Sequence, residues 1–138
     1  MGQAEFRGAD GVLLRELAAK QTVENDLVVA AKVDGVLRGL DERIPEDKAP
    51  EWVYLSSPMG ERIYRRSVLF LAIVAMREVY GAADTELAVR ASLNGALYCD
   101  MTLPGGVNDG TVSAIEIQMR AIVAEDRKIG HRTVSKEE

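Results

Sequence analysis

Apolar and polar positions in the first part of the chain alternate in short, well-defined runs. Apolar side chains at positions 13, 14, 17 and 18 share one helical face, which predicts an amphipathic helix over residues 12–20. Two β-prone runs, 27–33 and 36–40, flank the pair Asp34-Gly35. This pair favours the two positive φ angles of a type I′ turn, so the runs are predicted to form a hairpin.

The next stretch has the composition of a connection followed by a strand. Residues 41–50 are charged and carry two prolines, which disfavours regular structure. Residues 51–55 are again β-prone, and residues 56–60 form a turn cluster that we take as the joint between two units. One helix and several strands within residues 1–57 predict a small mixed α+β unit.

The strongest predicted helix follows this joint, over about 61–80. Its middle, residues 68–76, is apolar all round, which predicts burial on several sides. Gly81 lies where a left-handed residue closes a helix. The apolar run is shorter than the roughly 20 residues that a membrane-spanning helix needs, so we expect a buried helix and no membrane anchor.

The remaining pattern predicts two strands, a helix and a last strand. Strands are expected at 87–90 and 97–101, joined by a turn at Asn94-Gly95. Helical spacing of apolar residues predicts a helix over about 110–126, and residues 127–134 read as a final strand. Residues 135–138, Ser-Lys-Glu-Glu, have the form of a capping box, so the chain stops where a helix is expected to begin. Both a fragment of a longer protein and a natural tail fit this ending.

Composition narrows the class of protein. The 138 residues include 17 basic and 22 acidic side chains, giving a net charge of −5, and 47% are hydrophobic, as in globular domains. A negative chain does not hold nucleic acid by bulk charge, although a local basic patch remains compatible. Cys99 and His131 are the only residues of their kinds, which excludes a disulfide framework and a site with several Cys or His ligands. We expect a cytoplasmic protein.

Few residues carry recognisable chemistry. The chain has no G-x-x-x-x-G-K-[ST] phosphate loop and no G-x-S-x-G nucleophile motif to combine with His131. Cys99 is interpreted as a small core side chain. Arg62, Arg65 and Arg66 form a basic helical face, which is either a solvated surface or a contact for phosphate or nucleic acid.

Three segments in this order resemble a known pair of modules: VAAKVDGVLRGL at 29–40, IYRRSVLFL at 63–71 and SLNGALYCD at 92–100. They resemble the N-terminal part of threonyl-tRNA synthetases. The resemblance implies an α+β fold: a TGS-like β-grasp over 1–57, lacking most of the family's first hairpin, and an editing-domain-like module over 58–138. The second module is expected to pack a long buried helix on an antiparallel sheet and to be truncated at its C-terminal end.

The same pair of modules also precedes the catalytic domain in uridine kinase-like nucleoside kinases of bacteria. The synthetases carry an H-x-x-x-H pair for editing, and its two positions fall on Arg66 and Phe70 here, so the resemblance does not support editing chemistry. The kinase branch has an Arg-Ser pair and a Leu-Tyr-Cys strand, which match Arg66-Ser67 and residues 97–99. Ala91 stands where that branch usually has histidine.

We therefore expect the non-catalytic regulatory or ligand-binding front end of a uridine kinase-like nucleoside kinase whose ATP-binding domain is absent from the chain. The resemblance implies ATP and Mg for the full-length enzyme, no cofactor or metal in this chain, and the kinase domain as a partner. The alternative is an RNA- or nucleotide-binding module related to the synthetases, without editing activity. A freestanding hydrolase of mischarged tRNA is a third hypothesis. Candidate ligand-binding residues are Arg62, Arg65, Arg66, Ser67, Ser92, Asn94, Tyr98 and Cys99.

Overall fold

The computed structural model describes residues 11–21, 25–132 and 134–137. The chain divides into two compact units, unit 1 over residues 1–67 and unit 2 over residues 68–138. The boundary lies within the long helix α2 (Pro58–Tyr80), which starts in unit 1 and ends in unit 2. Both units combine helices with antiparallel strands, so the predicted α+β fold with a long helix is confirmed.

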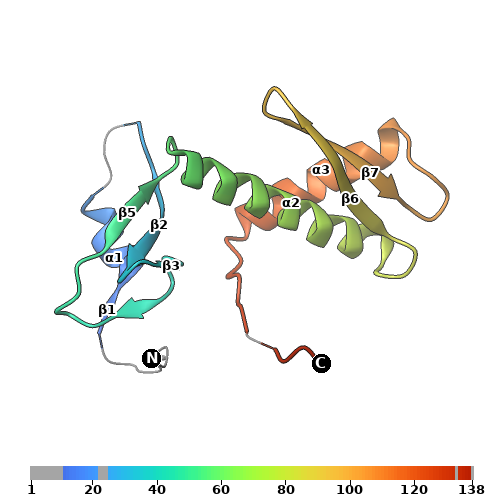
Figure 1. Cartoon of the computed structure of the whole chain (residues 1–138). Helices are drawn as coiled ribbons and strands as arrows, with labels where there is room; N and C mark the ends of the chain where they lie inside the picture. Colours follow the sequence, from blue (N-terminus) through green and yellow to red (C-terminus); the bar gives the residue numbers. More distant parts are fainter. Residues whose placement is uncertain (1–10, 22–24, 133, 138) are drawn as a thin grey trace. The chain divides into compact units, whose positions relative to one another are not determined.

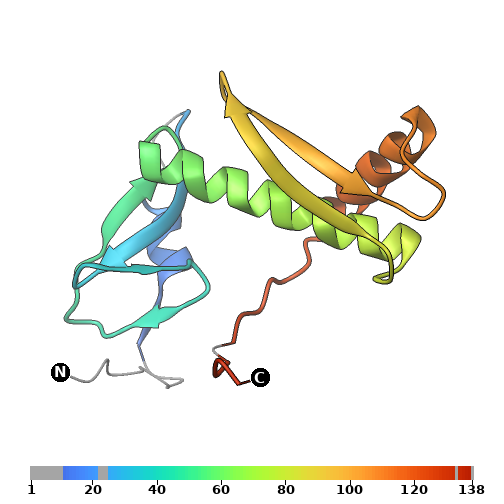
Figure 2. The ribbon, with the colours of Figure 1, turned by 45° about the vertical axis from the view of Figure 1, so that its right-hand side comes forward.

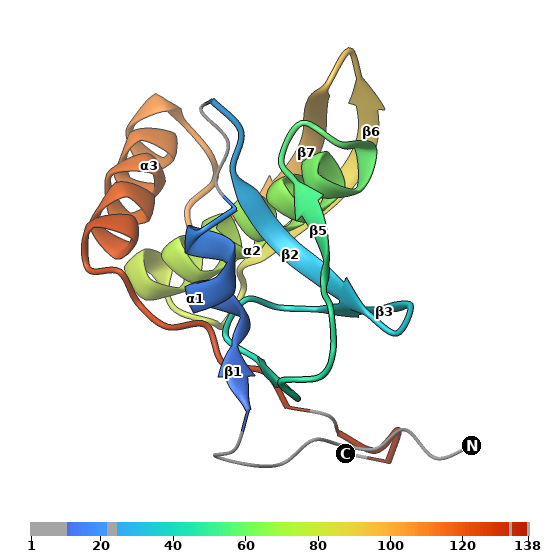
Figure 3. The ribbon, with the colours of Figure 1, turned by 90° about the vertical axis from the view of Figure 1, so that its left-hand side faces the viewer.

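Unit 1 is built on a three-stranded antiparallel sheet in the order β3-β2-β5 (Figure 1). The strands are β2 (Val28–Val33), β3 (Val36–Arg38) and β5 (Glu51–Tyr54). Asp34 and Gly35 between β2 and β3 have φ angles of 52° and 76°, as the predicted type I′ turn requires. Helix α1 (Leu14–Ala19) lies against β2 (Figure 3). The core formed in this way contains Leu14, Ala31, Val33 and Ile44.

Unit 1 also holds a small ladder that the pattern did not predict. Strand β1 (Val12–Leu13) pairs with β4 (Arg43–Ile44), which lies inside the stretch expected to be a connection. Ile44 is buried, and this tertiary contact favours the pairing although the charged local sequence does not. The sequence was expected to lack most of the first hairpin of the β-grasp. That expectation concerns residues 1–10, which lie outside the described part of the chain.

Unit 2 consists of the end of α2, a hairpin and a second helix. Strands β6 (Glu86–Leu93) and β7 (Ala96–Thr102) pair antiparallel, with Asn94 and Gly95 at positive φ in the turn, as predicted. Helix α3 (Asp109–Ala124) begins at a capping box in which Asn108 and Thr111 bond to each other's backbone. The core groups Ala75, Met76, Leu103, Ile115 and Ile122. Figure 2 shows α2, α3 and the hairpin from a second direction.

Two expectations for the second half are wrong. The middle of α2 is not buried on several sides, because only the C-terminal part of the helix packs in the unit 2 core. Val68 and Phe70 lie before that part, and their side chains are 37% and 49% exposed. The described residues of 127–134 form no strand, since they pair with no neighbouring ladder. Residues 135–137 carry neither helix nor strand. In the described residues, no helix is long and apolar enough to cross a bilayer.

Candidate functional site

The start of α2 is fastened to the end of β5. The Ser57 hydroxyl accepts a hydrogen bond from the Gly60 N–H at 3.1 Å and donates one to the Tyr54 carbonyl at 2.6 Å. Ser57 thus acts as the N-cap, and Pro58 occupies the first helical position, where its missing N–H costs nothing. The helix therefore begins three residues earlier than the predicted position 61. The Ser-Pro pair was the signal that sequence reasoning missed.

The predicted basic residues lie just after this fixed first turn, and they differ in their surroundings. Arg65 pairs with Glu61 one turn before it, at 2.5 Å. Arg62 and Arg66 are exposed and form no ion pair within the described residues. The Ser67 hydroxyl donates to the Ile63 carbonyl at 2.9 Å and is thereby engaged with its own helix. The structure thus leaves two guanidinium groups, one helical turn apart, directed to solvent.

The other four candidates lie on the hairpin of unit 2. Asn94 occupies the turn, with a φ of 49°. Ser92 pairs with Leu97 and Tyr98 with Ala91, and neighbouring pairs face opposite sides of a ribbon, so Ser92 and Tyr98 do not gather on one face. The structure does not unite these residues in a pocket.

Cys99 is exposed, and its interpretation as a core side chain is wrong. It lies on the same face of the ribbon as Met101, which does pack on the core. On β7 this face carries Leu97, Cys99 and Met101, but the core covers only the end near Leu87 and Met101. The apolar pattern of a strand does not show how many of its residues the core covers.

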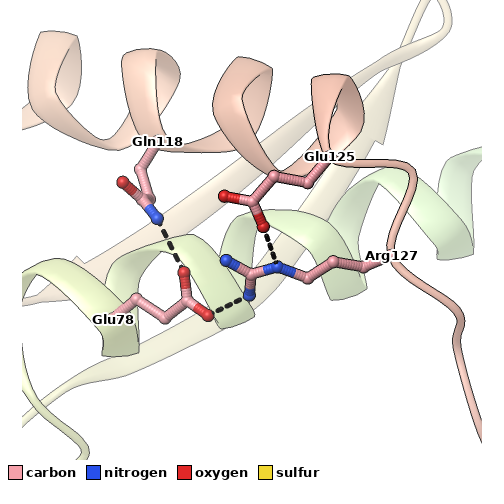
Figure 4. Close-up of polar contacts among 4 residues, drawn as sticks. All are labelled: Glu78, Gln118, Glu125 and Arg127. Atoms are coloured by element: carbon pink, nitrogen blue, oxygen red, sulfur yellow. Dashed lines mark hydrogen bonds and ion pairs between the residues drawn. The ribbon is translucent and has the colours of Figure 1, made fainter.

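A polar cluster that the sequence did not predict links both helices of unit 2 to the segment after them (Figure 4). Glu78 of α2 accepts a hydrogen bond from the Gln118 amide of α3 at 2.7 Å and also pairs with the Arg127 guanidinium. Arg127 donates from Nε to Glu125 at 2.5 Å. The cluster holds the chain beyond α3 against the end of α2 and has the geometry of a structural clamp.

The clamp shifts the pKa values of Glu78 and Arg127. Hydrogen bonds from Arg127 and then Gln118 stabilise the Glu78 carboxylate and lower its pKa below the ordinary value. Hydrogen bonds to Glu125 and then Glu78 raise the pKa of Arg127. In the described part of the chain, no group of three or more His, Cys, Asp or Glu side chains is arranged to hold a metal ion.

Replacing Glu78 by Gln is expected to lower the thermal midpoint slightly at neutral pH and to flatten its acid dependence. Because the folded pKa of Glu78 is lowered, its contribution is present above the unfolded pKa and is lost as pH falls through the folded value. The variant and the wild type should therefore converge once the pH falls below the lowered, folded-state pKa of Glu78. Thermal melts by circular dichroism across this range measure the effect. Glu116→Gln, on the exposed surface of α3, is the matched control, and an equal flattening in it would contradict the role of the clamp.

Comparison with known proteins finds threonine–tRNA ligases among the relatives of this chain. The threonine–tRNA ligase of Tropheryma whipplei (strain TW08/27) is 32% identical over 110 residues, which cover 80% of this chain and 17% of the ligase. The ligase of Thermotoga petrophila is 26% identical over 129 residues, 93% of this chain and 20% of its own. That of Anaplasma marginale (strain Florida) is 31% identical over 101 residues, 73% of this chain and 16% of its own.

No family model matches the chain, and no solved structure matches it. The expected nucleoside-kinase front end receives no support from these relatives, which are all threonine–tRNA ligases. The chain spans a fifth or less of the length of the three ligases compared. Over most of its length, this chain is homologous to the N-terminal region of threonyl-tRNA synthetases.

Proposed function

We propose that the chain is an RNA-binding module without editing activity, related to the N-terminal region of threonine–tRNA ligases. The observation that carries this proposal is the pair Arg62 and Arg66, exposed and free of ion pairs within the described residues, on a chain whose relatives are named for acting on tRNA. Arginine binds phosphate oxygens through a planar fork of N–H donors, and such contacts position an RNA backbone.

The two arginines are well placed for this role because their helix is held at its start. The Ser57 cap and its bond to Tyr54 tie the first turn of α2 to β5, so the guanidinium groups extend from an ordered element of unit 1. Arg65, by contrast, already pairs with Glu61, and it would have to give up that partner to bind phosphate. Arg62 and Arg66 therefore carry the contact.

The rest of the chain limits the affinity. With a net charge of −5, the chain as a whole repels phosphate, so binding depends on the local pair Arg62 and Arg66. The complex is expected to be weak and to dissociate as salt screens the two contacts.

Editing chemistry is not part of the proposal. In the resemblance to synthetases, Arg66 and Phe70 stand where the family has the imidazoles of its helix pair. A guanidinium does not give up its proton in proteins, and phenylalanine has no group that transfers one. Neither side chain can take over general acid–base catalysis.

The test is binding of a fluorescent threonine tRNA transcript, followed by anisotropy over a series of salt concentrations. Replacing both Arg62 and Arg66 by Ala should weaken binding by about tenfold at low salt and reduce the log–log salt slope by about 2, one per lost phosphate contact. Arg65→Ala should have a smaller effect, since this side chain is paired with Glu61.

The matched control is the double variant Arg77→Ala, Arg120→Ala, which removes the same charge from exposed positions of α2 and α3. It should bind as the wild type does. An equal loss in the control would mean that only net charge matters, and a wild type that binds no tRNA at low salt would overturn the proposal.

A further inference from the structure

The half of the β6–β7 hairpin nearest its turn leaves apolar side chains uncovered. Leu87 and Met101 pack on the unit 2 core, but every residue from 89 to 100 is exposed. Leu93 and Tyr98 are each 58% exposed, and the turn end projects away from α3 in Figures 1 and 2. A two-stranded ribbon is marginal without a third strand or a covering element. The free part of the hairpin is therefore suited to strand addition.

The two edges of the ribbon are not equivalent. In β6, Val89 pairs with Cys99 and Ala91 with Tyr98, so Arg90 is the extra residue of a bulge. Bulges and charged side chains discourage pairing at an edge, which protects β6.

Strand β7 carries no such protection. It contains neither proline nor lysine, and its single charged residue, Asp100, is already paired with Arg90 at 2.5 Å. Within the described residues, β6 is its only sheet neighbour. The outer edge of β7 is thus the one open to another strand.

We infer that this edge pairs antiparallel with β7 of a second copy of the chain, about a two-fold axis at Cys99, the middle residue of the strand. This register pairs the strand along its whole length. It sets Leu97 opposite the partner's Met101 and Tyr98 opposite the partner's Asp100, so apolar residues meet and no two carboxylates face each other. A two-fold contact requires a self-complementary surface, and the sequence of β7 has that property. The inference does not depend on RNA binding.

The first test is the mass in solution, by sedimentation over a range of protein concentrations. The wild type should form a dimer as concentration rises. Cys99→Lys places two ammonium groups opposite each other at the axis and should leave a monomer, while Cys99→Ser should remain dimeric. Ser92→Lys is the matched control: it adds the same charge at an exposed position of β6 and should not prevent the dimer. Circular dichroism checks that each variant is folded.

The second test uses Cys99 as the only thiol of the chain. Directly opposed residues of antiparallel strands have Cα atoms about 4.5–5.5 Å apart, within the range that a disulfide bridges. Copper–phenanthroline with oxygen removes two electrons from the two thiols, which release two protons as the S–S bond forms. The wild type should cross-link rapidly. A variant with Cys99→Ser and Ser92→Cys moves the thiol to β6 and should react about tenfold more slowly or less.

Three results would overturn the inference. One is a wild type that sediments as a monomer of 15.1 kDa at every concentration. That result is expected if other residues of the same chain cover the edge of β7, or if the edge stays unpaired. Another is a dimer that survives Cys99→Lys, which would place the contact elsewhere. The third is equal cross-linking from Cys99 and from a thiol at position 92, which would indicate random collision.

Discussion

Replacing Gly60 by Ala is expected to destabilise unit 1 by about 3 kcal/mol or more, because the new methyl group has no space. A Cβ at this position would lie 1.9 Å from the Tyr54 carbonyl oxygen, 2.7 Å from its carbon and 2.9 Å from the Leu55 Cα. All three atoms belong to the backbone, so no flexible side chain can move aside. The start of α2 would have to separate from the end of β5.

Trp52 provides the measurement, since it is the only tryptophan of the chain and packs against the unit 1 core. Urea unfolding followed by its fluorescence should show a much lower midpoint for Gly60→Ala. Gly39→Ala is the matched control, because a Cβ there meets nothing within 4 Å, and its midpoint should lie close to that of the wild type. Equal midpoints for the two variants would show that α2 does not approach β5 as described.

Leu14→Ala is expected to cost unit 1 about 2–5 kcal/mol. Leu14 is fully buried and shares its cluster with Ala31, Val33 and Ile44. Its removal leaves a cavity, and the small neighbours Ala31 and Val33 offer little volume to fill it. Because small domains are stable by only about 5–15 kcal/mol, this one substitution takes a large part of the total.

The same fluorescence assay applies, with Leu37→Ala as the control. Leu37 is 47% exposed on β3, so its truncation should change the free energy of unfolding by much less. If Leu14→Ala unfolds at the same urea concentration as Leu37→Ala, the assignment of the core is wrong.

The elements that the sequence predicted well are those with a local cause. The turns at Asp34-Gly35 and Asn94-Gly95 follow from residues that tolerate positive φ, and both hairpins form around them. The apolar periodicity of α1 and α3 follows from one buried face each. The same holds for the end of α2, where Gly81 adopts a φ of 85°.

The candidate site was predicted only in part, for a related reason. Spacing placed Arg62, Arg65 and Arg66 together on a helix, but it did not show that Glu61 occupies Arg65 and leaves the other two exposed. The clamp at Glu78 was missed, because Gln118 and Arg127 lie 40 and 49 residues away along the chain. No local signal joins residues at such separations.

By itself, the sequence determined the three helices, the two hairpins with their turns and the α+β class of this protein, because each depends on backbone preferences and periodicity within a few residues. Only the tertiary structure decided which apolar residues are covered. Cys99 and Phe70 are as apolar as their buried neighbours, yet both are exposed, because neighbouring elements stop short of them. Residues 127–132 have a strand-like pattern but form no strand, because a strand exists only where a partner offers its hydrogen bonds.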